Sequence, residues 1–221
     1  MQPETQLQTP SAATQYTQPV QAAYQPPMLS NSLQLKVRIT ELFITDGARL
    51  VCQAFLPGNS LKGNVLKENL DVFFDQARTQ PYFQIRERKV VGLSQTFDIT
   101  SSNEQLLASV QHNGIASFFI ESWAVLDANG SNIGSVKQGI IGGLVARFGG
   151  LRAFFPQTYT LTVNGQTIAQ YKERGGVHHF TVHINFLSNF ANSQYTLLAL
   201  AVAYILGNRR ISGGENGPPG I

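Results

Sequence analysis

The chain has 221 residues, of which 43% are hydrophobic and only 13% are charged, about half the share of roughly 25% that is usual in globular proteins. Its 16 basic and 13 acidic residues leave a net charge of +3, too small for the dense basic stripe of a nucleic-acid-binding protein. The single cysteine, Cys52, excludes an intramolecular disulfide and a cysteine-based zinc site. We therefore expect a globular protein with a large apolar core in the reducing cytoplasm.

The two ends of the chain differ in composition from its middle. Residues 1–32 contain five prolines, many glutamines and no basic residue, and Glu4 is their only charge. Such a segment buries too little apolar area to offset the entropy of ordering, so a disordered Gln/Pro-rich tail is predicted. It also carries no pattern of a secretory signal. Residues 211–221 are rich in glycine and proline and predict a second flexible tail, which leaves one domain over 33–210.

Four segments of this domain share one pattern, in which an aromatic residue and alternating side chains lead into an Asp/Asn/Gly/Ser turn and a second alternating run. They are Phe43–Phe55, Phe97–Val110, Trp123–Val136 and Tyr159–Tyr171. The pattern is typical of β-hairpins. Further strands are expected at 70–74, 82–91, 116–121, 153–155 and 180–186. Strands at such short intervals indicate a β-sandwich or a β-barrel.

One long helix is predicted near 192–206, with Asn192 or Ser193 at its start and Gly207 as the residue that ends it. Its apolar positions surround it on all sides and include Leu197, Leu198, Leu200, Val202, Ile205 and Leu206. The apolar stretch 195–206, twelve residues with one threonine, extends over about 18 Å as a helix, short of the roughly 30 Å of a bilayer core. Protein must therefore surround this helix. We expect a mainly β fold that closes around a buried C-terminal helix.

This arrangement resembles the superfamily of phospholipid scramblases, LURP-one-related proteins and Tubby-like C-terminal domains. The hairpin Trp123–Val136 resembles a recurrent hairpin of that superfamily, and Tyr159–Ala169 resembles the hairpin that follows it. Phe180–Phe190 leads into the apolar helix as the last strands of scramblases do. The resemblance covers most of 42–210. It implies a closed Tubby-like barrel of about twelve strands around the helix.

The chain also departs from that superfamily. Asn185–Ser193, which precedes the helix, contains no carboxylate, whereas scramblases resemble calcium-binding proteins in an acidic segment at this place. A hard cation needs several oxygen ligands with net negative charge, so no calcium site is carried over. The clustered cysteines that are lipidated in some scramblases are missing. The basic residues by which Tubby domains resemble phosphoinositide binders find no residue-by-residue match.

No constellation of residues predicts catalysis or a cofactor. His179 and His183 would lie about 13 Å apart on one strand, too far to share a metal ion, and His178 would point the other way. The Gly-rich segment Gly139–Gly150 lacks the Gly-Lys-Ser/Thr ending of a phosphate-binding loop. No nucleophile elbow and no convincing pair of acid and base is present. We therefore expect no enzyme activity, no metal and no cofactor.

Basic residues provide the candidate binding sites. Three groups could meet lipid phosphate through charge-assisted hydrogen bonds; the alternative is an ordinary solvated strand face. The groups are Arg86, Arg88 and Lys89, then Arg147 and Arg152, then Arg209 and Arg210.

The leading hypothesis is a non-enzymatic scramblase-like barrel that associates peripherally with anionic phospholipid or scaffolds a partner, without nucleic acid. Two alternatives stay open. The protein could be an interaction module recruited through its tail at 1–32. It could also scramble phospholipids, which would need a hydrophilic path through the bilayer.

Overall fold

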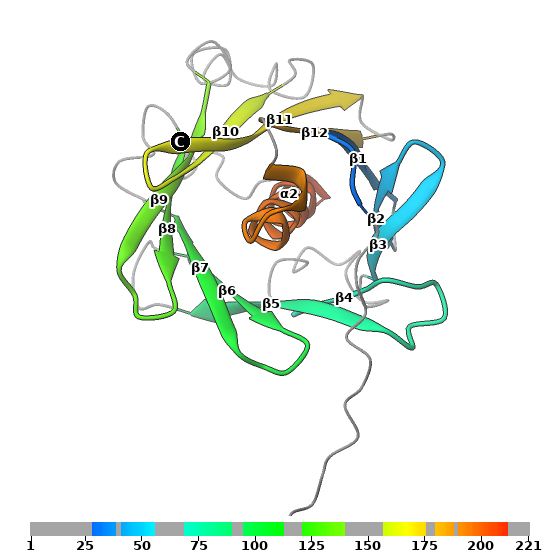
Figure 1. Ribbon diagram of the computed structural model, residues 1–221, viewed down its shortest axis with the longest axis horizontal. Coiled ribbons are helices and arrows are strands. Elements are labelled where there is room, and N and C mark those ends of the chain that lie inside the picture. Colours follow the sequence, from blue (N-terminus) through cyan, green and yellow to red (C-terminus); the bar gives the residue numbers. More distant parts are fainter. Residues whose placement is uncertain are drawn as a thin grey trace, which may run out of the picture.

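The computed structural model describes residues 28–38, 41–55, 69–89, 95–112, 121–139, 157–175, 180–187 and 190–211. Within them, twelve antiparallel strands form one closed barrel around a helix (Figure 1). The strands are β1 (Ser32–Val37), β2 (Glu41–Asp46), β3 (Arg49–Phe55), β4 (Leu70–Phe73), β5 (Pro81–Lys89), β6 (Gln95–Ser101), β7 (Leu106–His112), β8 (Ser122–Asp127), β9 (Asn132–Gln138), β10 (Thr158–Val163), β11 (Gln166–Gly175) and β12 (Phe180–Phe186). A 3-10 turn, η5 (Phe190–Asn192), leads into the helix α2 (Thr196–Ile211). The predicted fold class is confirmed.

Consecutive strands pair with one another, and β1 pairs with β12 to close the barrel. The four predicted hairpins are confirmed as β2–β3, β6–β7, β8–β9 and β10–β11. Two of them, β2–β3 and β10–β11, have two-residue loops, and in the second the loop residues Asn164 and Gly165 have φ values of 49° and 75°. Two positive φ values in a two-residue loop match the twist of the flanking strands, which is why an Asn-Gly pair occurs there. The strands expected near 70, 82 and 180 are also present, whereas 153–155 and most of 116–121 lie outside the described residues.

The first described residues belong to the folded part of the chain. Leu29 is 8% exposed and packs with the core. The Asn192 side chain accepts a hydrogen bond from the Leu29 amide (2.8 Å) and donates one to the Leu29 carbonyl (2.9 Å). β1 already begins at Ser32. Residues 28–32, which the composition assigns to the tail, are therefore part of the barrel.

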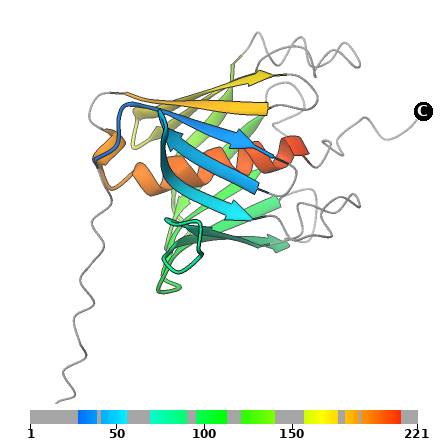
Figure 2. The ribbon, with the colours of Figure 1, turned by 90° about the vertical axis from the view of Figure 1, so that its right-hand side faces the viewer.

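The strands run between two rims that differ in their connections. We call one end the turn rim; the short turns at 47–48, 102–105, 128–131 and 164–165 lie there, together with η5 and the start of α2. At the other end, the loop rim, α2 comes to its end. Figure 2 shows the turn rim on the left and the loop rim on the right, with β1 and β2 toward the viewer. The helix thus extends along the inside of the barrel.

The inward-facing side chains and α2 form one apolar core. Leu198, Leu200, Val202, Ile205 and Leu206 are all buried, and Leu197 is partly buried against the core. The Tyr171 hydroxyl donates a hydrogen bond to the Ala199 carbonyl inside this core (3.0 Å). No helix in the described ranges is long and apolar enough to cross a membrane.

The helix bounds correct two predictions, because Asn192 belongs to η5 and Ser193 follows it, so neither residue starts α2. α2 begins at Thr196 and continues through Gly207 to Ile211, so Gly207 does not end the helix. A Cβ atom at Gly207 would lie only 2.6 Å from Leu35 Cδ2 and 3.3 Å from Leu42 Cδ2. Glycine at this position lets α2 pack closely against β1 and β2, and a larger residue would have to displace the methyl groups of Leu35 and its neighbours.

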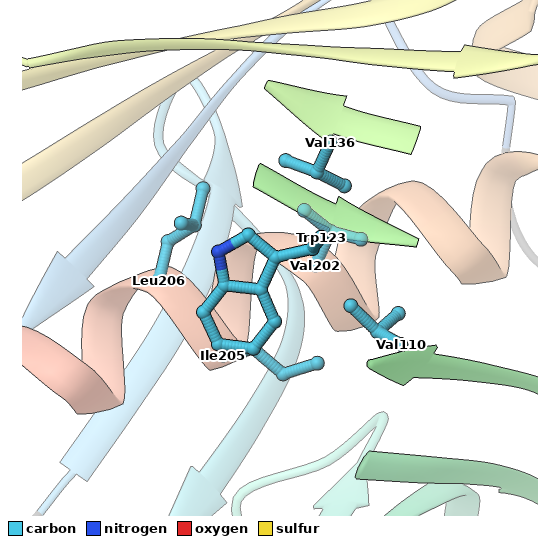
Figure 3. A pocket seen from close by; sticks show the side chains of 6 residues that line it. All are labelled: Val110, Trp123, Val136, Val202, Ile205 and Leu206. Carbon is cyan, nitrogen blue, oxygen red and sulfur yellow. The ribbon is translucent and has the colours of Figure 1, made fainter. Parts of the chain in front are cut away.

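On the other side of α2, the space toward β7, β8 and β9 is filled by larger side chains. Figure 3 shows a small apolar gap there, lined by Val110, Trp123, Val136, Val202, Ile205 and Leu206. The gap has no polar lining and no room for a water molecule. It is a packing imperfection of the core, and we do not consider it a ligand site.

Candidate anion-binding face

Basic side chains from three adjacent strands meet on the outer wall of the barrel. In the strand register, Thr181 of β12 lies between Arg174 of β11 and Lys36 of β1. In the next row, His183 lies between Lys172 and Gln34. Side chains directly opposite on neighbouring strands have Cβ atoms about 5 Å apart. We call the group formed by Lys36, Arg38, Lys172, Arg174 and His183 the basic face.

The strand pattern explains why these side chains point outward. Val182 and Ile184 of β12 and Leu33 and Leu35 of β1 are buried in the core. Because successive side chains alternate between the two faces of a strand, the residues between them point away from the core. Arg38, Lys172 and Arg174 are exposed, and Lys36 and His183 are partly exposed.

The basic face lies in a part of the wall without outward acidic residues. Across β9, β10, β11, β12 and β1, the outward positions carry a further cation, Lys137, and no carboxylate. The one acidic residue in these strands, Glu173, is 4% exposed and belongs to the inward-facing set of β11. In the described part of the chain, none of the four cations of the basic face lies within ion-pair distance of a carboxylate. Within the described ranges, none of the four cations is therefore held in an ion pair, although Glu41 of β2 lies beside Arg38, one position beyond the Val37–Leu42 pair.

An aromatic ring orients two of these cations. The Lys36 ammonium lies 6.0 Å and the Arg38 guanidinium 4.8 Å from the ring centre of Phe43 on β2. The backbone amide of Arg38 also donates a hydrogen bond to the Glu41 carbonyl (2.8 Å). A cation over an aromatic face gains about 0.5–1 kcal/mol at an exposed site. Both charges are thus held on the outer wall on the β2 side of β1.

His183 experiences the charge of its neighbours directly. Partial burial, followed by the nearby Arg174 and Lys172, lowers the pKa of the imidazole below its ordinary value of 6.5. Burial and like charges both disfavour the protonated form. At neutral pH, His183 is therefore neutral, and the formal charge of the basic face is that of its two lysines and two arginines.

The predicted cluster on β5 has a different environment. Arg86 and Arg88 share the outward face of β5, as expected, but each one forms an ion pair. Arg86 Nη2 lies 2.6 Å from Asp71 Oδ1, and Arg88 Nη2 lies 3.2 Å from Asp98 Oδ1. These charges are largely balanced within the wall. Lys89 ends β5 opposite Gln95.

The remaining predicted cations are only partly placed. Arg209 and Arg210 lie in the last turn of α2 at the loop rim, rather than beyond the helix. Arg147 and Arg152 lie outside the described residues, as do His178 and His179. The structure therefore places only two of the three predicted groups, one on β5 and one at the end of α2.

The sequence contains a signal for the basic face. Lys36 and Arg38, like Lys172 and Arg174, are basic residues two positions apart on a strand, the same spacing as Arg86 and Arg88. This spacing places both side chains of a pair on one face. What cannot be seen in the sequence is that residues about 135 positions apart lie side by side through β12.

A second polar cluster lies inside the barrel near the loop rim. The Trp123 indole N–H donates to Glu121 Oε1 (3.2 Å), and the Tyr159 hydroxyl donates to Glu121 Oε2 (3.4 Å). Beside them, Gln138 Nε2 donates to Gln157 Oε1 (2.5 Å). These buried groups satisfy one another and link β8, β9 and β10, so they stabilise the barrel wall. No group of three potential metal ligands exists among the residues described.

Comparison with known proteins adds no identification. No family model matches the chain, no curated protein matches it, and no solved structure matches the barrel.

Proposed function

We propose that this protein is a non-enzymatic, scramblase-like or Tubby-like barrel that associates peripherally with anionic phospholipid membranes through the basic face. One observation carries the proposal: four outward cations lie on β11, on β1 and directly after β1, and the outward positions of β11, β12 and β1 carry no carboxylate. Membranes rich in anionic lipid attract such clusters. Phe43 beside Lys36 and Arg38 adds an apolar group suited to the interface.

The geometry allows the four cations to reach one membrane surface together. Three neighbouring strands span only about 10 Å, so the wall across β11, β12 and β1 is nearly flat on the scale of a lipid headgroup. Each Lys or Arg near an anionic surface contributes about 1 kcal/mol. Four of them contribute about 4 kcal/mol, which corresponds to roughly a thousandfold gain in affinity. We therefore expect reversible binding that weakens with added salt.

Co-sedimentation with vesicles tests this proposal. The wild type should sediment with phosphatidylglycerol/phosphatidylcholine vesicles at low salt and remain in solution with pure phosphatidylcholine. Lys172→Ala/Arg174→Ala should bind roughly thirtyfold more weakly, because two unbalanced cations are lost. The matched control is Arg86→Ala/Arg88→Ala, which removes the same formal charge from ion-paired positions. It should retain most of the binding.

Two results would contradict the proposal. The first is a wild type that fails to bind anionic vesicles even at low salt. The second is an equal loss of binding in both double variants, which would mean that net charge alone, rather than the basic face, determines association.

A further inference from the structure

His183 occupies the centre of the basic face and can change its charge near neutral pH. Charged or titratable groups reach it from both neighbouring strands. β11 contributes Lys172, directly opposite, and Arg174 on the diagonal. β1 contributes Gln34, directly opposite, and Lys36 on the diagonal. Along β12 itself, the outward neighbours are the uncharged Thr181 and Asn185.

These neighbours leave a protonated His183 without a negative partner among the described residues. In the free protein, protonation would add one more positive charge beside Lys172 and Arg174, which is unfavourable. Lys36 is the more distant third cation, with its ammonium over Phe43 on β2. A phosphate group above the same three cations would reverse this balance, because the fourth charge would then be attracted by the anion. Binding and protonation would thus favour each other, and by linkage the effect is reciprocal.

We propose that the basic face takes up a proton at His183 when it binds an anionic membrane, so that association strengthens as the pH falls. This inference rests on the proposed function and adds its regulation. The basic face then carries four charges at slightly alkaline pH, where His183 is neutral, and five once His183 is protonated at acidic pH. The protein would accumulate on anionic membranes that face an acidified compartment or an acidified cytoplasm.

The test measures vesicle binding at about pH 8 and about pH 5.5, a range in which His changes its charge. Phosphatidylglycerol vesicles are the probe, because their phosphodiester remains singly charged over this range. The wild type should bind about fivefold more tightly at the lower pH, as expected for one added charge near the surface.

Two variants assign this effect to His183 rather than to the other histidines, His112, His178 and His179. His183→Gln stays uncharged, so it should bind like the wild type at pH 8 and gain much less at pH 5.5. His183→Arg is charged throughout, so it should already bind at pH 8 about as tightly as the wild type does at pH 5.5. Both substitutions lie on the outer wall, and circular dichroism checks that the barrel is retained.

The possible failures are distinguishable. If the wild type binds anionic vesicles but His183→Gln gains as much at low pH as the wild type does, the proton is taken up elsewhere and this inference is wrong. The proposed function would then stand. If the wild type binds at neither pH, the proposed function and this inference both fail.

Discussion

At the scale of single residues, Gly134 shows how a close approach between strands determines the residue type. A Cβ atom at this position would collide with the Thr162 carbonyl oxygen and lie 3.0 Å from Val163 Cα. Both are backbone atoms of β10, which cannot move without breaking the pairing with β9. Only glycine fits here.

We therefore expect Gly134→Ala to lower the free energy of unfolding by about 1–3 kcal/mol, the range typical of overpacking. Urea denaturation followed by circular dichroism measures this loss. Ser135→Ala, at the next position, is the control, because its partly exposed side chain points to the other face of β9. A Gly134→Ala protein as stable as this control would mean that β9 and β10 separate more easily than their close contact implies.

At the scale of elements, α2 determines whether the barrel can exist. Leu200 is fully buried between the helix and the wall, and burying an unpaired carboxylate there would cost several kcal/mol. That cost is comparable to the whole stability of a domain. Leu200→Asp should therefore abolish cooperative unfolding and the native circular dichroism spectrum.

Leu107→Asp on β7 provides the matched control for this prediction. It makes the same chemical change at a leucine that is 38% exposed on the outer wall. This variant should fold, with a loss of no more than about 1 kcal/mol, as is usual for surface sites. A folded and cooperative Leu200→Asp protein would show that the barrel does not need its helix as a core.

At the scale of the whole molecule, the charge on the barrel wall predicts how the protein lies on a membrane. The basic face is on β11, β12 and β1, whereas β7 lies five strands away from β12 in the twelve-stranded order. The barrel should therefore lie on its side, with β7 directed away from the lipid and both rims accessible.

Single labels can test this orientation. Burial raises the pKa of the Cys52 thiol to about 12, so the native cysteine should not react with a maleimide label in the folded protein. Asn185→Cys on β12 and Leu107→Cys on β7 introduce exposed thiols on nearly opposite walls. A fluorophore at residue 185 should be quenched by a lipid-borne quencher, and one at residue 107 much less. Equal quenching at both positions would contradict the side-on orientation.

The features that the sequence predicts correctly are local ones. The Asn164–Gly165 turn and the three similar hairpins depend on residues within about a dozen positions of one another, and turn chemistry specifies them. The apolar helix is also a local feature, because Leu200 and the other apolar residues that identify it follow one another in a single segment of the sequence. The pairing of β1 with β12 cannot be predicted from a local pattern, because the two strands lie far apart in the sequence.

The candidate site shows the same limit more strongly. Arg86 and Arg88 form the more noticeable basic cluster in the sequence, but Asp71 and Asp98 balance them in the barrel. Lys36 and Arg174 do not form a recognisable cluster in the sequence, because more than 130 residues separate them. Whether a charge is balanced depends on its neighbours in space, and pairing between distant strands determines those neighbours.

The sequence by itself therefore determined the hairpins, the buried helix and the need for a wall around it, because side-chain periodicity and turn residues act over short stretches of chain. Only the tertiary structure decided how the barrel closes, which glycines face a neighbouring backbone, and which cations remain unbalanced. These features depend on the register between β1, β12 and β11. A shift of that register by one residue would turn Lys36, Lys172 and Arg174 away from a common surface. No turn fixes the pairing of β1 with β12, because these strands lie at opposite ends of the domain.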